Sequence, residues 1–386
     1  MKVLVFSTLY PNEQQTQHGV FVENGLKTFV ANHNVEVRVC APVPWFPLKN
    51  EIFGQYASLA KIAKKERRHG ISIDHPRYPV IPKFGMNISP WLLAKAMLPV
   101  LKSYIDEGFD FDIIDAHFCY PDGVAAIWLA QQLNKPVMVS ALGSDINLYR
   151  HFKWPNRHLL KWLPQASAIS AVCQALIDTT DEMGIGCEHK VVLRNGVNLE
   201  LFKPNDAESS VDLKTLVIVG NLVEVKQHHL LIDAMSLLPD YTLKIIGDGP
   251  LKQSLTLQAE QLGLVERISF LGRLKQPDMI PHIQSAGALI LCSQSEGWAN
   301  VLLESMACGT PVVATAVGGT PEVVTSESKG ILVEKHTPKA LAEAILTLFQ
   351  CYPDRVDVRN YAEQFSWDET AAVKYKLFQQ LIAKRN

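Results

Sequence analysis

Two blocks of alternating short apolar runs and helix-sized segments restrict what this sequence can fold into. The first block begins with the apolar run 2–6 and continues to about residue 193, and the second begins near residue 215. Repeated strand-then-helix patterns are typical of βαβ units, whose strands are parallel. We therefore predict an α/β protein with two doubly wound parallel sheets that bind ligands at the carboxyl ends of their strands.

The chain length supports the same division, because 386 residues exceed what one compact core usually holds. A polar, breaker-rich segment, 199–210, separates the two blocks and is the predicted linker. We expect an N-terminal domain over 1–198 and a C-terminal domain over 211–366. The last helix, within 367–386, is expected to pack back onto the first domain. The proline-rich stretch 42–90 is expected to be irregular.

The composition, 47% apolar and 20% charged, is that of a globular enzyme. Seven scattered cysteines without a C-x-x-C pair indicate free thiols, and no apolar run is long enough to span a bilayer. We therefore expect a cytoplasmic protein. One basic run could touch anionic lipid at the inner face of the membrane, although a solvated charged face is the default interpretation of such a run. Its cations are Lys61, Lys64, Lys65, Arg67 and Arg68.

The segment 293–311 carries the strongest chemical signal. It is predicted to run from the end of a buried strand through a Gly-containing loop into a helix over 300–307, with Gly309 just past its end. A helix N-terminus favours an anion such as a diphosphate. The nearby carboxylates of Glu296 and Glu304 cannot bind phosphate, but they can accept hydrogen bonds from sugar hydroxyls. The segment is therefore predicted to hold a sugar attached to a phosphate.

The run Ser295-Glu296-Gly297…Glu304-Ser305-Met306-Ala307-Cys308-Gly309-Thr310-Pro311 resembles the E-x7-E signature of retaining GT-B glycosyltransferases of family 4. The resemblance extends over nearly the whole chain. In the first half it is similar to the branch that acts in surface polysaccharide synthesis, such as the teichuronic acid glycosyltransferases. Further matching segments are 219–226, 247–250, 318–322, 195–198, 116–123 and 143–146.

The resemblance implies the GT-B architecture, with two Rossmann-like domains facing a cleft, the acceptor in the first and a UDP- or GDP-sugar in the second. Glu296, Lys226 and His117 are the implied catalytic residues: Glu296 at the donor sugar, Lys226 at the leaving diphosphate, and His117 near the reacting sugar and acceptor. Glu304 is the implied ribose ligand. Other implied or weaker donor contacts are Gly297, Ala299, Asn300, Arg273 and Gly19, and the weak acceptor candidates are Asp145 and Asp122.

Each assignment has a plainer alternative. Gly19 can be a plain helix-start glycine, Gly297 can be a turn residue, and Arg273 can be a surface cation. Asp122 and Asp145 can cap helices. The sequence also departs from the family pattern, with Asn221 where an Arg is common, Gln227 after the lysine where Gly is common, and Asn198 in place of Asp. Without that Arg, Lys226 and the helix N-terminus are expected to carry more of the diphosphate binding.

The predicted activity is transfer of a hexosyl group to a lipid-linked or oligosaccharide acceptor. No metal or other cofactor is expected, because the D-x-D spacing at 110–112 leads into a buried strand and no H-E-x-x-H motif is present. Nucleic acid is not an expected partner. Two alternatives remain: a sugar-nucleotide-binding protein without activity, and a GT-B sugar-nucleotide epimerase.

Overall fold

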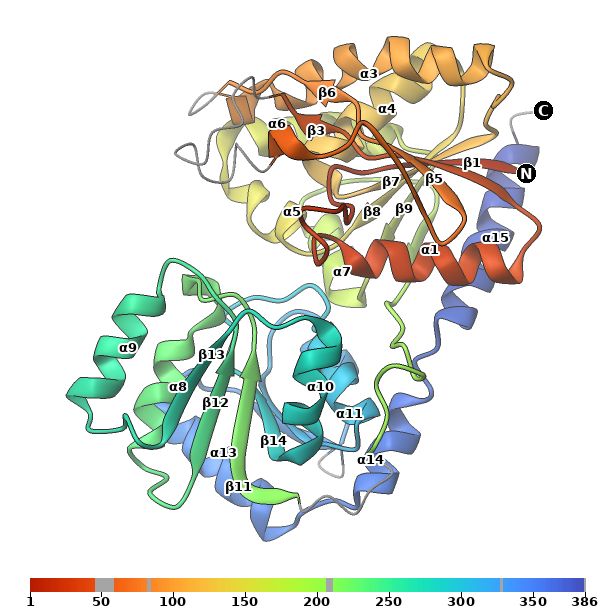
Figure 1. Ribbon diagram of the computed structural model, residues 1–386. Coiled ribbons are helices and arrows are strands. Elements are labelled where there is room, and N and C mark those ends of the chain that lie inside the picture. The colour runs from red at the N-terminus through yellow and green to blue at the C-terminus, as the bar shows by residue number, and fades with distance from the viewer. Residues whose placement is uncertain (46–58, 82–84, 206–210, 327–328, 385–386) are drawn as a thin grey trace. The chain divides into compact units, whose positions relative to one another are not determined.

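A computed structural model describes residues 1–45, 59–81, 85–205, 211–326 and 329–384 (Figure 1). The chain divides into two compact units. Unit 1 comprises Met1–Asn195 together with the C-terminal Trp367–Asn386, and unit 2 comprises Gly196–Ser366. Both units are α/β with parallel sheets, which confirms the predicted fold class.

Unit 1 is built on a sheet of eight described strands in the order β10-β9-β8-β7-β1-β2-β5-β4. All neighbouring pairs are parallel except β4 with β5, which form an antiparallel hairpin at the sheet edge. The strands are β1 (Lys2–Phe6), β2 (Glu36–Cys40), β4 (Lys65–Arg68), β5 (Ile71–Asp74), β7 (Ile113–His117), β8 (Val137–Ala141), β9 (Ala168–Ala171) and β10 (Lys190–Val192), with a separate pair β3 (Val43–Pro44) and β6 (Arg77–Tyr78).

The helices of unit 1 include the C-terminal one, which packs along the first. Phe29 of α1 meets Phe378 of α15 edge to face at 5.8 Å, and His33 stacks on Tyr375 at 4.2 Å. No helix among the described residues is both long and apolar enough to cross a bilayer. The helices are α1 (Val20–Asn32), α3 (Ser89–Asp106), α4 (Val124–Leu133), α5 (Ser144–Asn147), α6 (Lys153–Trp162), α7 (Gln174–Glu182) and α15 (Trp367–Ala383), with short turns η2 (Gly85–Asn87), η3 (Cys119–Gly123), η4 (Tyr149–His151) and η5 (Leu163–Gln165).

The expectation that 42–90 is irregular was wrong for much of its described part. Strand β5 extends the main sheet by pairing with β2, as in Arg38 opposite Ser72, and β4 pairs with β5. The prolines lie outside these two strands, and Pro44 belongs to the separate two-stranded pair. The segment adds edge strands because β2 offers an open hydrogen-bonding edge, a partner that local sequence patterns do not reveal.

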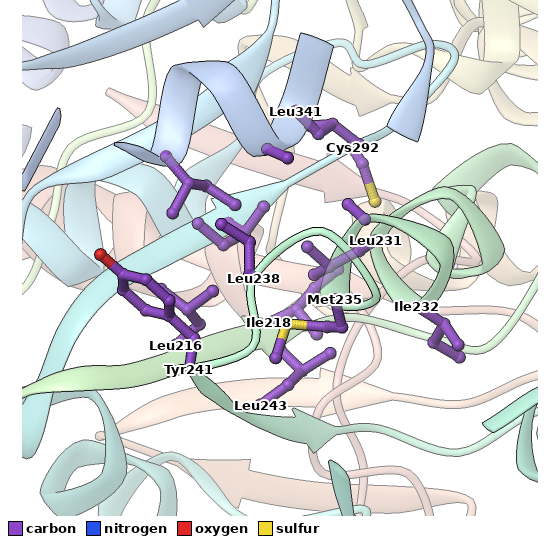
Figure 2. Close-up of a cluster of buried hydrophobic side chains, with 14 of the residues drawn as sticks. Leu216, Ile218, Leu231, Ile232, Met235, Leu238, Tyr241, Leu243, Cys292 and Leu341 are labelled. Carbon is purple, nitrogen blue, oxygen red and sulfur yellow. The ribbon is translucent and has the colours of Figure 1, made fainter. Parts of the chain in front are cut away.

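Unit 2 has the strand order β13-β12-β11-β14-β15-β16, all parallel. Its core lies between this sheet and helices such as α8, where Leu231 and Met235 pack against Ile218 (Figure 2). The elements are β11 (Asp212–Val219), β12 (Thr242–Ile246), β13 (Ile268–Gly272), β14 (Ala286–Leu291), β15 (Val312–Thr315), β16 (Gly330–Val333), α8 (His228–Met235), α9 (Lys252–Gln261), α10 (Gln276–Ser285), α11 (Asn300–Ala307), α12 (Thr320–Val323), α13 (Pro338–Gln350), α14 (Arg355–Ala362) and the turn η6 (Glu224–Lys226).

Each sheet has one point where the direction of strand addition reverses, and ligands of open α/β sheets bind beside the carboxyl ends at such points. In unit 2 this point lies between β11 and β14, and the loops that follow these strands carry Lys226 and Glu296. In unit 1 it lies between β1 and β7, which lead to Gly19 and end at His117. The topology therefore brings each pair of predicted site residues to one sheet edge.

Candidate active site

The centre of the site in unit 2 is an ion pair between two predicted catalytic residues. Lys226 Nζ lies 2.5 Å from Glu296 Oε1, and the two side chains are 26% and 10% exposed. Lys226 is the last residue of the turn η6, and α8 begins at His228. Gln227 between them adopts a left-handed φ of 47°, which explains why glycine suits this position.

The loop that holds Glu296 is clamped by backbone contacts from a neighbouring loop. Gly318 has a φ of 52°, and a Cβ built there would lie 1.9 Å from the carbonyl oxygen of Glu296. The amide of Gly319 donates to the carbonyl of Gly297 at 3.1 Å. Only a residue without a side chain permits this approach, so the position of Glu296 depends on Gly318.

Helix α11 spans Asn300–Ala307, as expected from the sequence. It ends in a Schellman motif, with Gly309 at a φ of 75° donating to Met306 and Thr310 donating to Ser305. Glu304 accepts a hydrogen bond from Gln276 Nε2 at 3.3 Å, and desolvation raises its pKa to about 7. A hydrogen bond from a hydroxyl donor would stabilise the ionised form of this desolvated carboxyl group.

The other predicted donor contacts lie around the same edge. Gly297 and Asn300 are partly exposed, and Ala299, at the N-cap of α11, is buried. Arg273 follows β13 directly and is exposed. The ring of Trp298 is buried and lies 6.1 Å from that of Phe365, a packing contact.

Sequence reasoning missed three further polar side chains in unit 2. Ser293, His228 and Thr320 are fully buried, and their side-chain polar atoms have no hydrogen-bond partner among the described residues. Burial and the nearby Lys226 ammonium lower the pKa of His228 to about 4. Unpaired buried polar atoms are costly, so these three side chains are candidates for contact with a polar ligand. Their positions next to Lys226, Glu296 and Gly319 in sequence were the only available signal.

In unit 1, His117 is the last residue of β7 and belongs to a buried charged chain. Its Nε2 lies 3.2 Å from Asp115 Oδ2, and Lys374 Nζ of α15 donates to the same oxygen at 2.8 Å. Burial opposes ionisation of Asp115, but the ammonium of Lys374 and the imidazole of His117 hold its pKa well below its usual range. An ionised Asp115 accepts a proton-bearing Nε2, so Nδ1 of His117 is the nitrogen left for a ligand.

The carboxyl groups of the two weak acceptor candidates accept hydrogen bonds from neighbouring loops. Asp122 accepts from the amide and hydroxyl of Thr8 at 2.6 and 2.9 Å, and Asp145 accepts from the amides of Cys119 and Gly143 at 2.6 and 2.7 Å. Both carboxyl groups are fully buried. Gly19 caps α1 with a φ of 72°, and a Cβ there would meet the carbonyl oxygen of Leu9 at 2.3 Å.

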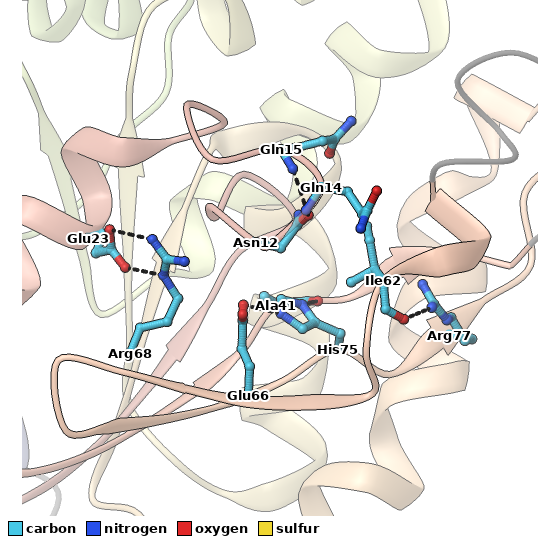
Figure 3. A network of polar contacts seen from close by, with 10 residues as sticks. All are labelled: Asn12, Gln14, Gln15, Glu23, Ala41, Ile62, Glu66, Arg68, His75 and Arg77. Atoms are coloured by element: carbon cyan, nitrogen blue, oxygen red, sulfur yellow. Dashed lines mark hydrogen bonds and ion pairs between the residues drawn. The ribbon is translucent and has the colours of Figure 1, made fainter. Parts of the chain in front are cut away.

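The predicted basic membrane patch is partly engaged within unit 1. Arg68 forms a two-pronged ion pair with Glu23 at 2.6 and 3.3 Å, and neighbouring Glu66 bonds to His75 (Figure 3). Ile62, the largest apolar side chain of the run 61–68, is buried. Lys64, Lys65 and Arg67 are exposed. The patch therefore offers charge to a membrane without an exposed large apolar side chain.

Unit 1 also contains a cavity of about 500 Å³ at the carboxyl ends of β1 and β2. Its lining mixes aromatic rings with polar groups: Tyr10, Tyr78, Tyr120 and Tyr149 together with Asn12, Gln15, His18 and His75. No group of three or more His, Cys, Asp or Glu in the described part of the chain is placed to hold a metal ion.

Comparison with known proteins identifies a family for each half of the chain. Residues 18–201 match the family described as Glycosyltransferase Family 4, and residues 200–365 match Glycosyl transferases group 1. The putative teichuronic acid biosynthesis glycosyltransferase of Bacillus subtilis is 27% identical over 89% of this chain and 88% of its own length.

Solved structures show the same architecture. Sucrose-phosphate synthase from Thermosynechococcus elongatus superposes with a TM-score of 0.79 at 18% identity, covering 99% of both chains. The Anabaena HepE protein in complex with UDP-glucose gives 0.71 at 20% identity, covering 100% of this chain and 99% of its own. With both halves matched by family models and the fold shared throughout, the chain belongs to the group 1, family 4 glycosyltransferases of GT-B fold.

Proposed function

We propose that this enzyme is a retaining glycosyltransferase that moves a hexosyl group from a nucleoside diphosphate sugar to a lipid-linked or oligosaccharide acceptor in surface polysaccharide assembly. The Lys226–Glu296 pair beside the N-terminus of α11 carries the proposal. A cation for the diphosphate and an anion for the sugar hydroxyls lie together at the switch point of unit 2. The UDP-glucose complex of the Anabaena relative supports a donor of this class, and GDP-sugars remain candidates.

In the proposed reaction, Lys226 and the N–H groups at the start of α11 stabilise the negative charge of the departing nucleoside diphosphate. The bond between the sugar C1 and the phosphate oxygen breaks, and the acceptor hydroxyl forms the new bond on the same face. The hydroxyl proton goes to the leaving phosphate, so no protein nucleophile is needed. Glu296 holds the sugar hydroxyls and favours the positive charge that develops on the ring.

Glu304 is the proposed ribose ligand, because hydrogen bonds from ribose hydroxyls would stabilise its desolvated carboxylate. Gly297, Ala299, Asn300 and Arg273 are proposed further donor contacts, and Ser293, His228 and Thr320 offer additional polar atoms. In unit 1, His117 is proposed to accept a hydrogen bond from a substrate hydroxyl through Nδ1. The 500 Å³ cavity is the proposed acceptor site.

Peripheral contact with the inner face of a membrane is part of the proposal, because a lipid-linked acceptor lies in a bilayer. Lys61, Lys64, Lys65 and Arg67 could contribute attraction to anionic lipid. We also propose that transfer needs no metal, since Lys226 and backbone N–H groups supply the positive charge at the diphosphate. Retained turnover in excess chelator is the expected result, and loss of turnover that Mg²⁺ restores would contradict it.

The decisive experiment measures release of nucleoside diphosphate from UDP- and GDP-sugars with and without glycan acceptors, and determines the product anomer by NMR. We expect release only with acceptor and an α-linked product from an α-linked donor. Release at the same rate without acceptor would indicate hydrolysis or epimerisation, and binding without release would indicate a non-catalytic protein. Lys226→Met should abolish turnover. Lys339→Met is the matched control, because Lys339 forms an exposed pair with Glu343 in the same unit.

A further inference from the structure

A second surface of unit 1, outside the predicted basic patch, combines exposed apolar side chains with positive charge. The stretch 146–177 contains no Asp or Glu, and its four cations all fall within 150–161. In the same short region Leu148, Phe152, Trp154 and Leu160 are 40–50% exposed. We call these four side chains, together with Arg150, Lys153, Arg157 and Lys161, the α6 surface.

Helix α6 shows why these residues point outward. It buries Pro155, Leu159 and Trp162 against the unit, at a spacing that leaves Trp154, Arg157 and Lys161 on the opposite side. The guanidinium of Arg157 lies over the ring of Trp154, with its carbon 5.2 Å from the ring centroid. The surface therefore presents a large apolar ring and a positive charge side by side.

The apolar part of the surface continues onto the neighbouring turn η2. Met86 of this turn and Ile88, which follows it directly, are about 40% exposed. The hydroxyl of Tyr120 donates to the carbonyl of Met86, and the ring of Tyr120 stacks on His158 of α6 at 6.0 Å. These contacts hold η2 beside α6, so the exposed apolar side chains form a group rather than isolated residues.

We propose that the α6 surface binds the interface of a bilayer that contains anionic lipid. Trp, Phe and Leu next to Lys and Arg are the side chains that interfacial helices insert at the level of the head groups. Arg150 forms a long ion pair with Glu182 at 3.8 Å, and the exposed cations Lys153, Arg157 and Lys161 complement a negative surface potential. A second copy of this chain fits poorly, because a symmetric contact would set the four cations against their own copies. Lysine is also depleted in the cores of protein interfaces.

The surface adjoins the cavity of unit 1. Met86 and Tyr149 line that cavity, and they neighbour Ile88 and Leu148 of the exposed apolar group in sequence. A lipid-linked acceptor bound in the same bilayer would therefore lie near the cavity mouth. This last point rests on the proposed function, whereas membrane binding itself does not, since vesicle binding is measured without either substrate.

Sedimentation with vesicles of phosphatidylcholine, with and without phosphatidylglycerol, tests the proposal. Wild type should bind the anionic vesicles and be released by salt. Phe152→Ser with Trp154→Ser leaves the charge unchanged and should lower the partition coefficient roughly tenfold. Lys153→Glu with Arg157→Glu should lower it at least as much. Quenching of Trp154 fluorescence by brominated acyl chains should disappear in Trp154→Phe.

Two matched controls separate this surface from general effects. Leu257→Ser with Val265→Ser removes comparably exposed apolar side chains from unit 2 and should leave vesicle binding unchanged. Lys64→Glu with Arg67→Glu reverses two charges of the other basic patch. It should lower the partition coefficient less than Lys153→Glu with Arg157→Glu does. Every variant must keep the thermal transition of the wild type.

Three results would overturn the proposal. The first is failure of the wild type to pellet with anionic vesicles. The second is a loss of vesicle binding in the Leu257 and Val265 control as large as that in the α6 variants. The third is dissociation of a dimer in solution by the Phe152 and Trp154 variant with unchanged vesicle binding, which would assign the surface to a protein contact.

Discussion

Lys226 Nζ and Glu296 Oε1 lie 2.5 Å apart, although 70 residues separate them in the chain. The cation proposed for the diphosphate is therefore already paired with the anion proposed for the sugar. A bound diphosphate would have to share or replace that partner. The pair sets the Lys226 ammonium in place but also reduces the charge that it offers to phosphate.

Glu296→Gln should tighten binding of the nucleoside diphosphate while it removes turnover. The substitution releases Lys226 and removes a negative charge beside the phosphates, so we expect the Kd for UDP or GDP to fall roughly fivefold, or about 1 kcal/mol. Loss of the sugar contact should lower kcat by at least about a hundredfold. Calorimetric titration and steady-state kinetics measure both effects. Weaker nucleotide binding in Glu296→Gln would show that the ion pair does not compete with the diphosphate.

Lys374→Met should destabilise unit 1 because it leaves Asp115 buried without its cation. Asp115 is 2% exposed and accepts from Lys374 at 2.8 Å, so loss of the partner should cost about 3–5 kcal/mol of unfolding free energy. Asp115→Asn with Lys374→Met should recover part of this loss, because the buried charge is then absent. Urea unfolding of both single variants and the double variant gives the coupling energy. Simple additivity of the two single effects would contradict the pairing.

Asp122 should make stability fall as the pH rises from about 4 to 7. Burial raises its pKa to about 7, so in this window the native state holds a proton that the unfolded chain has released. Stability from this group is complete below its unfolded pKa and is lost as the pH passes the folded pKa. Relative to Asp122→Asn, wild type should lose up to about 4 kcal/mol across the window. Urea unfolding curves at several pH values test the difference, and parallel pH profiles would refute it.

Gly318→Ala should disturb the catalytic loop far more than Gly70→Ala disturbs unit 1. Both glycines have positive φ, 52° and 81°, but a Cβ at Gly70 meets nothing within 4 Å whereas one at Gly318 collides with the carbonyl of Glu296. We expect a cost of about 1 kcal/mol at Gly70, from backbone strain alone. At Gly318 we expect a larger loss of unfolding free energy together with a lower kcat, because Glu296 must move. Equal stability losses and unchanged kcat in both variants would argue against the clamp.

Local sequence patterns were sufficient where the causes are local. The bounds of α11 follow from its apolar spacing and from Gly309, whose left-handed backbone completes the motif that ends the helix. The alternation of strands and helices likewise predicted the α/β class. The edge hairpin of β4 and β5 was missed, because its formation depends on the open edge of β2 rather than on a strong pattern of its own.

The sequence by itself determined the fold class, the family and the identity of the charged residues, because apolar periodicity, turn glycines and motif spacing are written along the chain. Only the tertiary structure decided which charges meet. It paired Lys226 with Glu296. It brought Lys374 of the last helix to Asp115, whose carboxylate orients His117. It also placed backbone amides that donate hydrogen bonds to Asp122 and Asp145. Such pairings depend on the parallel sheets placing distant loops at one edge, and no local pattern records that proximity.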